Sequence, residues 1–564
     1  MTTTDSQHPQ PALLYDFSRS DLWEERIGSI DDTLDTTFKL FHHSVVGVGG
    51  LTVRKFMRLV HEAGGQDFFM LIEEALQGGA EGAEERLAQA LDGLDGLDSS
   101  TLFLNDLLKS LLRTKRLSLS APEADHSWDA DFELKQMLSL YLLVIGLNSF
   151  FWGALRRLMP ASLEQHRVTQ TPPPLHLLRT CLRLTGVDAE ILQRAIIQRR
   201  WEVDASGRYI RSLQATSLQA TDKLTAMALA PVQQRLPGSL DVKPLTYFSR
   251  ETHIHQLPYS DRYVLVGLSY DLITPNASRR TYGDGSNGEK KLPAFELMAI
   301  PHEVGHFVYH HAHLKDGMPC HNLSDQFADN PYQRWCEEIF ADVYGCLVAG
   351  PLVALGLQAI LATGDWEQIG EDDSEHPTPL VRPFLLSEIL REWGRQQPDR
   401  YDFPQAIKSL NANWAGILQR WGFEIVGWVD GEPARIKVPG QADEYRETIF
   451  NVQTVVTAVR PMIERFVRSL LENVDFAPWD GDSQTELSAD IPWGRADSAD
   501  LTRYDDDMAR LSGDQMKVKA VPGFRVTGLG DSWLREEGET ADEKLESFVA
   551  RWIDSGPTGH GDHG

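Results

Sequence analysis

Apolar residues recur along this chain far more often with the spacing of helices than with that of strands. Residues 51–63 and 68–76 repeat apolar positions about every 3.6 residues, and residues 175–235 have the same character. Further helices are expected over 383–398, 404–421 and 445–473. The pattern predicts a mainly α protein with a small β-sheet.

Two stretches have the composition of strands. Residues 263–273 are rich in Val, Leu and Tyr, and Thr252 to His255 before them are expected to be strand or turn. Residues 423–438 are typical of a β-hairpin that turns at Asp430-Gly431. Both an edge strand and an internal strand remain open for 263–273.

One apolar run, residues 137–155, is long enough to cross a bilayer. Ser139, Asn148 and Ser149 interrupt it, and it lies within a helix-rich region. We therefore expect a buried core helix rather than a membrane span. A second apolar run, 346–362, is broken by glycine and proline and is expected to continue a buried helix.

Composition divides the chain into five stretches. We expect residues 1–15 to be disordered, 16–170 to form a helical N-terminal domain, and 175–250 to form a helical connecting region. Residues 251–474 are expected to form the α+β core domain. Residues 475–564 are acidic and loop-rich, which suits a cover over the core, a flexible tail or a docking arm.

Charge and cysteine content limit the classes of function. The net charge of −28 argues against a nucleic-acid partner or an anionic membrane surface, because no basic field would attract phosphate. Four cysteines in 564 residues do not form a disulfide framework and favour a reducing compartment. The first residues lack the basic and apolar regions of a signal peptide. These features predict a cytoplasmic protein.

The chemistry concentrates in His302-Glu303-Val304-Gly305-His306, an HExxH pattern inside an apolar stretch. On a helix the i, i+4 spacing puts both imidazoles on one face, where they can hold one zinc ion at about 2.0–2.1 Å. Glu303 is rotated off that face and can reach a metal-bound water. Two solvated histidines on a surface helix are the alternative, which the apolar neighbours disfavour. Pro301 suggests a kink or a late helix start.

A second helix is expected to complete the metal site. Glu338 and Asp342 are again i and i+4, on one face of that helix. A carboxylate there would complete a His₂Glu zinc site with one position open. Asp342 would lie one turn on, where it can accept a hydrogen bond from a ligand histidine.

The Glu-x-x-x-Asp-x-x-Gly pattern after HExxH resembles the gluzincins, the thermolysin-like zinc metallopeptidases. The resemblance implies a zincin-like core with Glu338 as ligand, Asp342 as the acid behind a ligand histidine and Gly345 as a close-packing glycine. Glu337 stands where thermolysin has asparagine, and it would be the ligand if the register were shifted.

Other ligand sets fit less well. Metzincins need a glycine and a histidine where this chain has Tyr309 and Ala312. The remaining histidines and cysteines of the region match no zinc module, and we expect the histidines after His306 to be solvated at a polar helix end; the residues are His310, His311, His313, Cys320, His321 and Cys336.

A third motif, His376-Pro377 followed by Arg382, resembles an element of the prenyl-protein-protease type of zincin. The resemblance implies that His376 and Arg382 bind the oxyanion of the tetrahedral intermediate. A proline-rich turn with a surface ion pair is the alternative. The two resemblances together cover about residues 260–385 and rest on the three motifs.

Together the motifs predict a zinc-dependent metalloendopeptidase, a hydrolase that cleaves a protein or peptide substrate. Zinc at His302, His306 and Glu338 would activate a water, and Glu303 would be the general base. A protein regulator is compatible with the long flanking regions. The alternative is a non-catalytic zinc-binding scaffold or regulatory protein built on a zincin core. A hydrolase acting on another kind of substrate also stays open.

Overall fold

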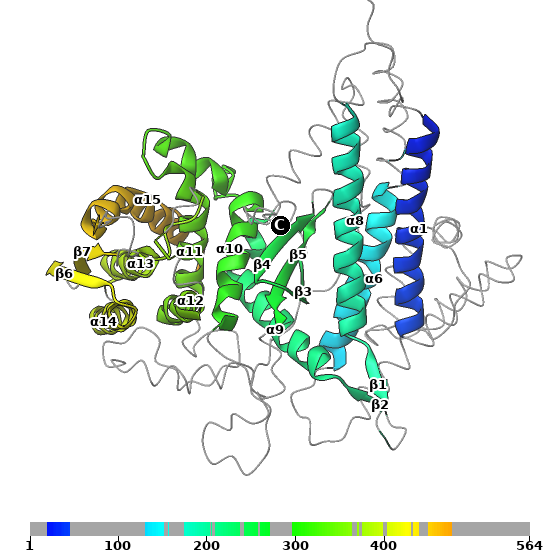
Figure 1. Cartoon of the computed structure of the whole chain (residues 1–564), viewed down its shortest axis with the longest axis horizontal. Coiled ribbons are helices and arrows are strands. Elements are labelled where there is room, and N and C mark those ends of the chain that lie inside the picture. The colour runs from blue at the N-terminus through cyan, green and yellow to red at the C-terminus, as the bar shows by residue number, and fades with distance from the viewer. Residues whose placement is uncertain are drawn as a thin grey trace, which may run out of the picture.

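The structure is a computed structural model that describes about half of the chain, and its elements are shown in Figure 1. The described residues are 20–45, 130–151, 156, 174–203, 205, 209–236, 242–257, 260–270, 296–363, 369–370, 375–398, 403–429, 432–438 and 449–476. They are mainly helical with small sheets, which confirms the predicted fold class. The expectations for residues 1–15, 51–63, 68–76 and 477–564 lie outside this part of the chain.

Three helices of the N-terminal half lie side by side: α1 (Ser20–Val45), α6 (Ala130–Phe150) and α8 (Pro174–Gln198) (Figure 1). Apolar side chains of α6 such as Leu143 and Leu147 are fully buried, which confirms the expected core helix over its described length. Among the described residues, no helix has the length and apolar character needed to cross a membrane.

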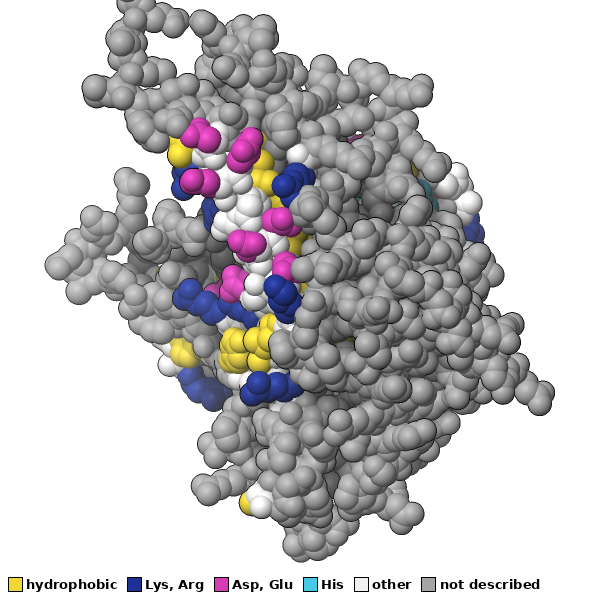
Figure 2. All heavy atoms as spheres, turned by 90° about the vertical axis from the view of Figure 1, so that its right-hand side faces the viewer, with side chains coloured by type: hydrophobic (Ala, Val, Ile, Leu, Met, Phe, Trp, Pro, Cys, Tyr) yellow, Lys and Arg dark blue, Asp and Glu magenta, His cyan; other side chains and the backbone are white. Residues whose placement is uncertain are grey.

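The outer face of α1 is acidic. Figure 2 shows the side of the molecule that carries this helix, where acidic side chains gather on the described surface with basic side chains nearby. The exposed acidic residues of α1 are Asp21, Glu24, Glu25 and Asp32. This distribution agrees with the net charge of −28.

A short hairpin interrupts the region 175–235, which the sequence pattern presented as helical throughout. Strands β1 (Trp201–Val203) and β2 (Tyr209–Arg211) pair antiparallel between α8 and α9 (Leu213–Leu229). Three-residue strands are too short to alter a helical periodicity averaged over a longer window. Ser212 then starts α9 by accepting a hydrogen bond from the backbone N–H of Ala215 at 3.0 Å.

A three-stranded sheet lies between α8 and α10 (Ala299–His311) (Figure 1). Its order is β3 (Lys243–Ser249), β5 (Ser260–Ser269), β4 (His253–Leu257), with β3 parallel and β4 antiparallel to β5. The strand expected near 263–273 is therefore the internal one, and the hypothesis that it is an edge strand is wrong. The sheet begins at Lys243, upstream of the expected core-domain boundary at residue 251.

Among the described helices, α10 and α11 (Cys336–Ala349) share the most extensive contact. Pro301 is the third residue of α10, where a backbone N–H would have no partner within the helix, so the proline fits the first turn without a kink. A Cβ added at Gly305 would lie 2.7 Å from the Ala341 Cα, and one at Gly345 would lie 3.3 Å from the His302 backbone nitrogen. Both glycines therefore allow the two backbones to approach.

The C-terminal half packs against this pair, and helices were found near 383–398 and 404–421 as expected. The helix expected over 445–473 begins only at Val452, because residues 449–450 form a short strand, and the expected helical run 346–362 is divided in two. Gly350, with a φ of 65°, separates α11 from the next helix. The elements are η6 (Glu296–Met298), η7 (Cys320–Phe327), η8 (Gln333–Trp335), α12 (Pro351–Thr363), α13 (Arg382–Gln396), α14 (Pro404–Arg420), β6 (Glu424–Val429), β7 (Glu432–Lys437), β8 (Ile449–Phe450) and α15 (Val452–Asn473).

We expect Gly305→Ala to destabilise the protein by about 1–3 kcal/mol, because the added methyl group would force α10 and α11 apart. The measurement is the free energy of unfolding in urea. Gly416→Ala in α14 is the matched control, since its Cβ would meet nothing within 4 Å. That change should stabilise the helix by about 0.5–1 kcal/mol. Equal effects of both changes would show that the helix contact is not tight.

Candidate metal centre

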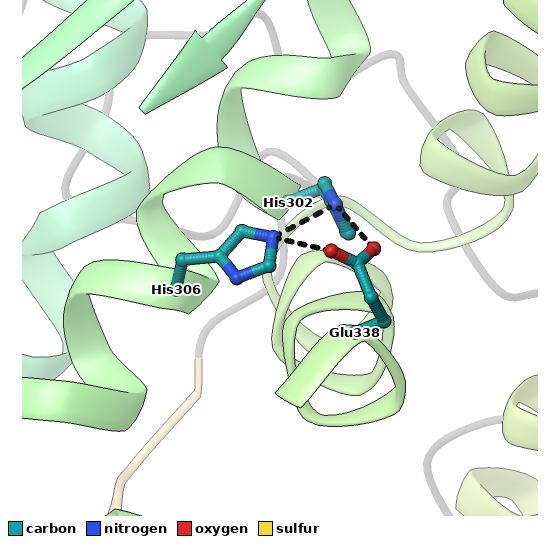
Figure 3. A group of neighbouring side chains, drawn as sticks. All are labelled: His302, His306 and Glu338. Carbon is teal, nitrogen blue, oxygen red and sulfur yellow. Dashed lines mark hydrogen bonds and ion pairs between the residues drawn. The ribbon is translucent and has the colours of Figure 1, made fainter. Parts of the chain in front are cut away.

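Helices α10 and α11 bring His302, His306 and Glu338 together, and all three side chains are buried (Figure 3). The two Nε2 atoms of the histidines are 3.2 Å apart. Glu338 Oε1 lies 3.3 Å from His306 Nε2, and Glu338 Oε2 lies 3.5 Å from His302 Nε2. The three residues that the sequence predicted as ligands therefore face one another from two different helices.

These separations can be compared with those of a tetrahedral metal site. Two ligand atoms about 2.0–2.1 Å from one ion, at a tetrahedral angle, are about 3.3 Å from each other. The Nε2–Nε2 distance of 3.2 Å matches that value, and each histidine faces a different oxygen of Glu338, His306 at 3.3 Å from Oε1 and His302 at 3.5 Å from Oε2. His302, His306 and Glu338 thus form a buried group that could hold a metal ion, and its donor set does not by itself decide which metal.

A carboxylate from α11 orients each histidine. His302 Nδ1 lies 2.9 Å from Asp342 Oδ1, and His306 Nδ1 lies 2.9 Å from Glu337 Oε1. An Nδ1–H that donates to a carboxylate leaves the Nε2 lone pair free for a metal. Asp342 therefore has the position expected behind a ligand histidine. Glu337, the alternative ligand, lies on the Nδ1 side of His306 instead.

Arg382 lies against the carboxylates of the centre. Its Nε and Nη2 donate to the two oxygens of Asp342 at 3.0 and 2.9 Å, and Nη2 also donates to Glu338 Oε2 at 2.9 Å. Nη2 is 3.2 Å from His302 Nε2. The guanidinium is thus engaged with the ligand side chains, and holding them in place is its visible role. Its predicted contact with an oxyanion stays a prediction.

His376 lies at the rim of the centre. Its Nε2 is 3.3 Å from Glu338 Oε1, and its side chain is 20% exposed. It does not belong to the group that could share one ion, since its nitrogen is not close enough to all three ligand atoms. Its predicted contact with an oxyanion stays a prediction.

Glu303, the acidic residue of the HExxH motif, takes no part in the contacts that hold the centre together. It is 9% exposed, and within the described part of the chain its carboxylate makes no hydrogen bond or ion pair. Its charge still reaches the centre. Burial lowers the pKa of Arg382, but the carboxylates of Asp342, Glu338 and, more weakly, Glu303 raise it above its usual range.

The electrostatics of the centre favour a bound cation. Burial lowers the pKa of His302, but its bonds to Asp342 and Glu338 outweigh burial and raise that pKa to about 10. Burial raises the pKa of Glu338, but the charges of His306 and Arg382 hold it well below its ordinary range. Without a metal, the carboxylates are therefore charged and the imidazoles hold protons, which a metal ion would replace.

The pairing of Glu337 with His310 was not predicted from the sequence. His310 Nε2 lies 3.0 Å from the same Glu337 Oε1 that accepts from His306. The i, i+4 spacing of His306 and His310 puts both side chains on one face of α10 and could have indicated a shared partner. Among the described residues, His311, His313, Cys320, His321 and Cys336 belong to no group that could hold a metal.

Comparisons with protein-family models, curated proteins and solved structures found no match for this chain.

The raised pKa of His302 predicts that metal affinity increases with pH. Its proton must leave before Nε2 can bind a metal, and with a pKa near 10 the proton is still bound at pH 6 to 8. Each proton released should strengthen apparent affinity about tenfold per pH unit. Calorimetric titration with zinc in buffers of different ionisation enthalpy measures the protons released. Affinity that does not change between pH 6 and 8 would contradict the assignment.

Proposed function

We propose that this protein is a zinc-dependent metalloendopeptidase that hydrolyses peptide bonds of a protein substrate. The observation that carries the proposal is the contrast among the four carboxylates near the two histidines. Glu337, Glu338 and Asp342 are bonded to histidines, whereas Glu303 makes no bond within the described residues. A buried carboxylate without a structural partner beside a metal group suits a general base.

The number of ligands supports catalysis over a structural role. Structural zinc sites are normally closed by four protein ligands, whereas catalytic sites use three and leave a position for water or substrate. In the part of the chain that the structure describes, only His302, His306 and Glu338 lie close enough to share one ion. This count favours the enzyme over the non-catalytic scaffold.

The proposed reaction uses four side chains besides the ligands. Bound zinc supplies Lewis acidity, which polarises a carbonyl and activates water at neutral pH. Glu303 accepts a proton from the attacking water and passes it to the leaving amine as the C–N bond breaks. His376 donates a hydrogen bond to the oxyanion. Asp342 and Arg382 hold His302 and Glu338 in place.

We expect Glu303→Gln to reduce hydrolysis strongly and to keep the metal, because the amide cannot accept the proton but fills the same space. Metal content by mass spectrometry should stay near one zinc per chain. Cleavage of denatured casein and of mixed fluorogenic peptides should fall by about 10²–10⁴-fold, the usual contribution of a general base.

His306→Ala is the paired variant for this test, since it should lose both metal and cleavage. Retained cleavage in Glu303→Gln would reject the general base. Metal binding by the wild-type protein without cleavage of any tested substrate would favour the scaffold. Absence of metal after zinc is added would reject both.

We expect His376→Ala to reduce kcat by about 10²–10³-fold, the loss typical of one oxyanion donor, with metal content unchanged. His376 is 20% exposed and contacts one oxygen of Glu338, whose other oxygen accepts a hydrogen bond from Arg382, so its removal should leave the ligands in place. The measurements are kcat and KM on one peptide, together with metal content. A loss of metal, or a change in KM alone, would contradict the role.

A further inference from the structure

One carboxylate oxygen links the metal centre to the end of α10. Glu337 Oε1 lies 2.9 Å from His306 Nδ1 and 3.0 Å from His310 Nε2. The side chains of Glu337 and His310 are 25% and 22% exposed, so the contact lies where the buried centre meets the surface. His310 is not expected to bind a metal directly, since it does not belong to the group of side chains that could share one ion.

Local helix geometry places these three groups. His306 and His310 are one turn apart on α10 and lie on one face. Glu337 is the second residue of α11, one position before the ligand Glu338. Successive helical residues are about 100° apart, so the two glutamates approach His306 from different sides. Glu338 meets its Nε2, and Glu337 meets its Nδ1.

The two ligand histidines are therefore supported in parallel ways. Asp342 bonds His302 Nδ1 and is held by two hydrogen bonds from Arg382. Glu337 bonds His306 Nδ1, and the residue that holds Glu337 is His310. The contact of Asp342 with His302 is almost fully buried, whereas the contact of Glu337 with His310 is partly exposed.

We propose that Glu337 and His310 are positioning residues for the metal centre: Glu337 fixes the tautomer and orientation of His306, and His310 fixes Glu337. This proposal rests on the metal-binding part of the proposed function. The Glu337 charge makes the His306 Nε2 a stronger donor to a metal. His310 keeps a long, partly exposed side chain from turning to solvent, so its effect passes through Glu337.

A surface ion pair without consequence is the alternative explanation of these contacts. Exposed ion pairs contribute about 0–1 kcal/mol to stability, and removing one would leave metal affinity unchanged. The alternative and the proposal therefore differ in the dissociation constant of the metal, and this difference can be measured without a substrate.

The test uses the full-length protein with Glu337→Gln, His310→Phe and the double variant. Glutamine keeps an acceptor oxygen and removes only the charge. Phenylalanine keeps an aromatic ring in place of the imidazole, whose centroid lies 5.2 Å from that of the Tyr309 ring. We expect Glu337→Gln to weaken zinc binding by about 10–100-fold. His310→Phe should weaken it by a smaller factor, and the double variant should be no weaker than Glu337→Gln alone.

Asp325→Asn is the matched control, because it removes an exposed negative charge from the neighbouring η7 and should leave zinc affinity unchanged. Cobalt supplies a spectroscopic readout. In the cobalt-loaded protein, the visible absorption bands should shift in Glu337→Gln and stay unchanged in the control. A structural effect alone would change the unfolding midpoint of both loaded and metal-free protein without shifting these bands.

Several outcomes would overturn the proposal. Unchanged zinc affinity and unchanged cobalt bands in Glu337→Gln would reject the role of Glu337 while leaving the metal site intact. Additive losses in the double variant would show that His310 does not act through Glu337. If Glu337→Gln does not fold, unchanged affinity in His310→Phe overturns the proposal. Failure of the wild-type protein to bind zinc would instead reject the metal site itself.

Discussion

The close contact of α10 with α11 is the constraint on which the metal centre depends. Gly305 lets the α10 backbone approach Ala341, and Gly345 lets the α11 backbone approach His302. At this spacing, histidines from one helix and carboxylates from the other meet within hydrogen-bonding distance. A side chain at either glycine would separate the helices by several tenths of an ångström or more, and the side chains that could share one ion would move apart.

The carboxylates that gather between the two helices need positive charge close to them. Glu303, Glu337, Glu338 and Asp342 gather around two histidines, and Arg382 is the one arginine bonded to them among the described residues. Burying several carboxylates is costly unless positive charge accompanies them. Protons on the imidazoles supply part of that charge without a metal, which is why the pKa of His302 rises despite burial. A divalent ion would supply it at the position where the three ligand atoms converge.

The surrounding structure holds Arg382 and the carboxylates in place. Arg382 is the first residue of α13, whose fully buried Glu388 accepts hydrogen bonds from Arg391, Arg395 and Arg460. This network fastens α13 to α15 and, through Glu432, to β7. The C-terminal helices thus fix the side of the centre away from the sheet, and the sheet fixes the other side through its contact with α10.

The sequence by itself determined the helical character of the chain and singled out His302, His306 and Glu338, the group that could hold a metal ion, because i, i+4 spacing is a local property that survives in any packing. The same spacing indicated that Asp342 would lie beside a histidine of the group, and it lies beside His302. Glu337, the partner of His306, was considered from the sequence only as an alternative ligand. The tertiary structure decided that β5 is internal, that Glu337 supports His306 together with His310, and that Arg382 is engaged with Asp342 and Glu338. These facts depend on contacts between segments far apart in the chain, whose register and approach no local pattern encodes.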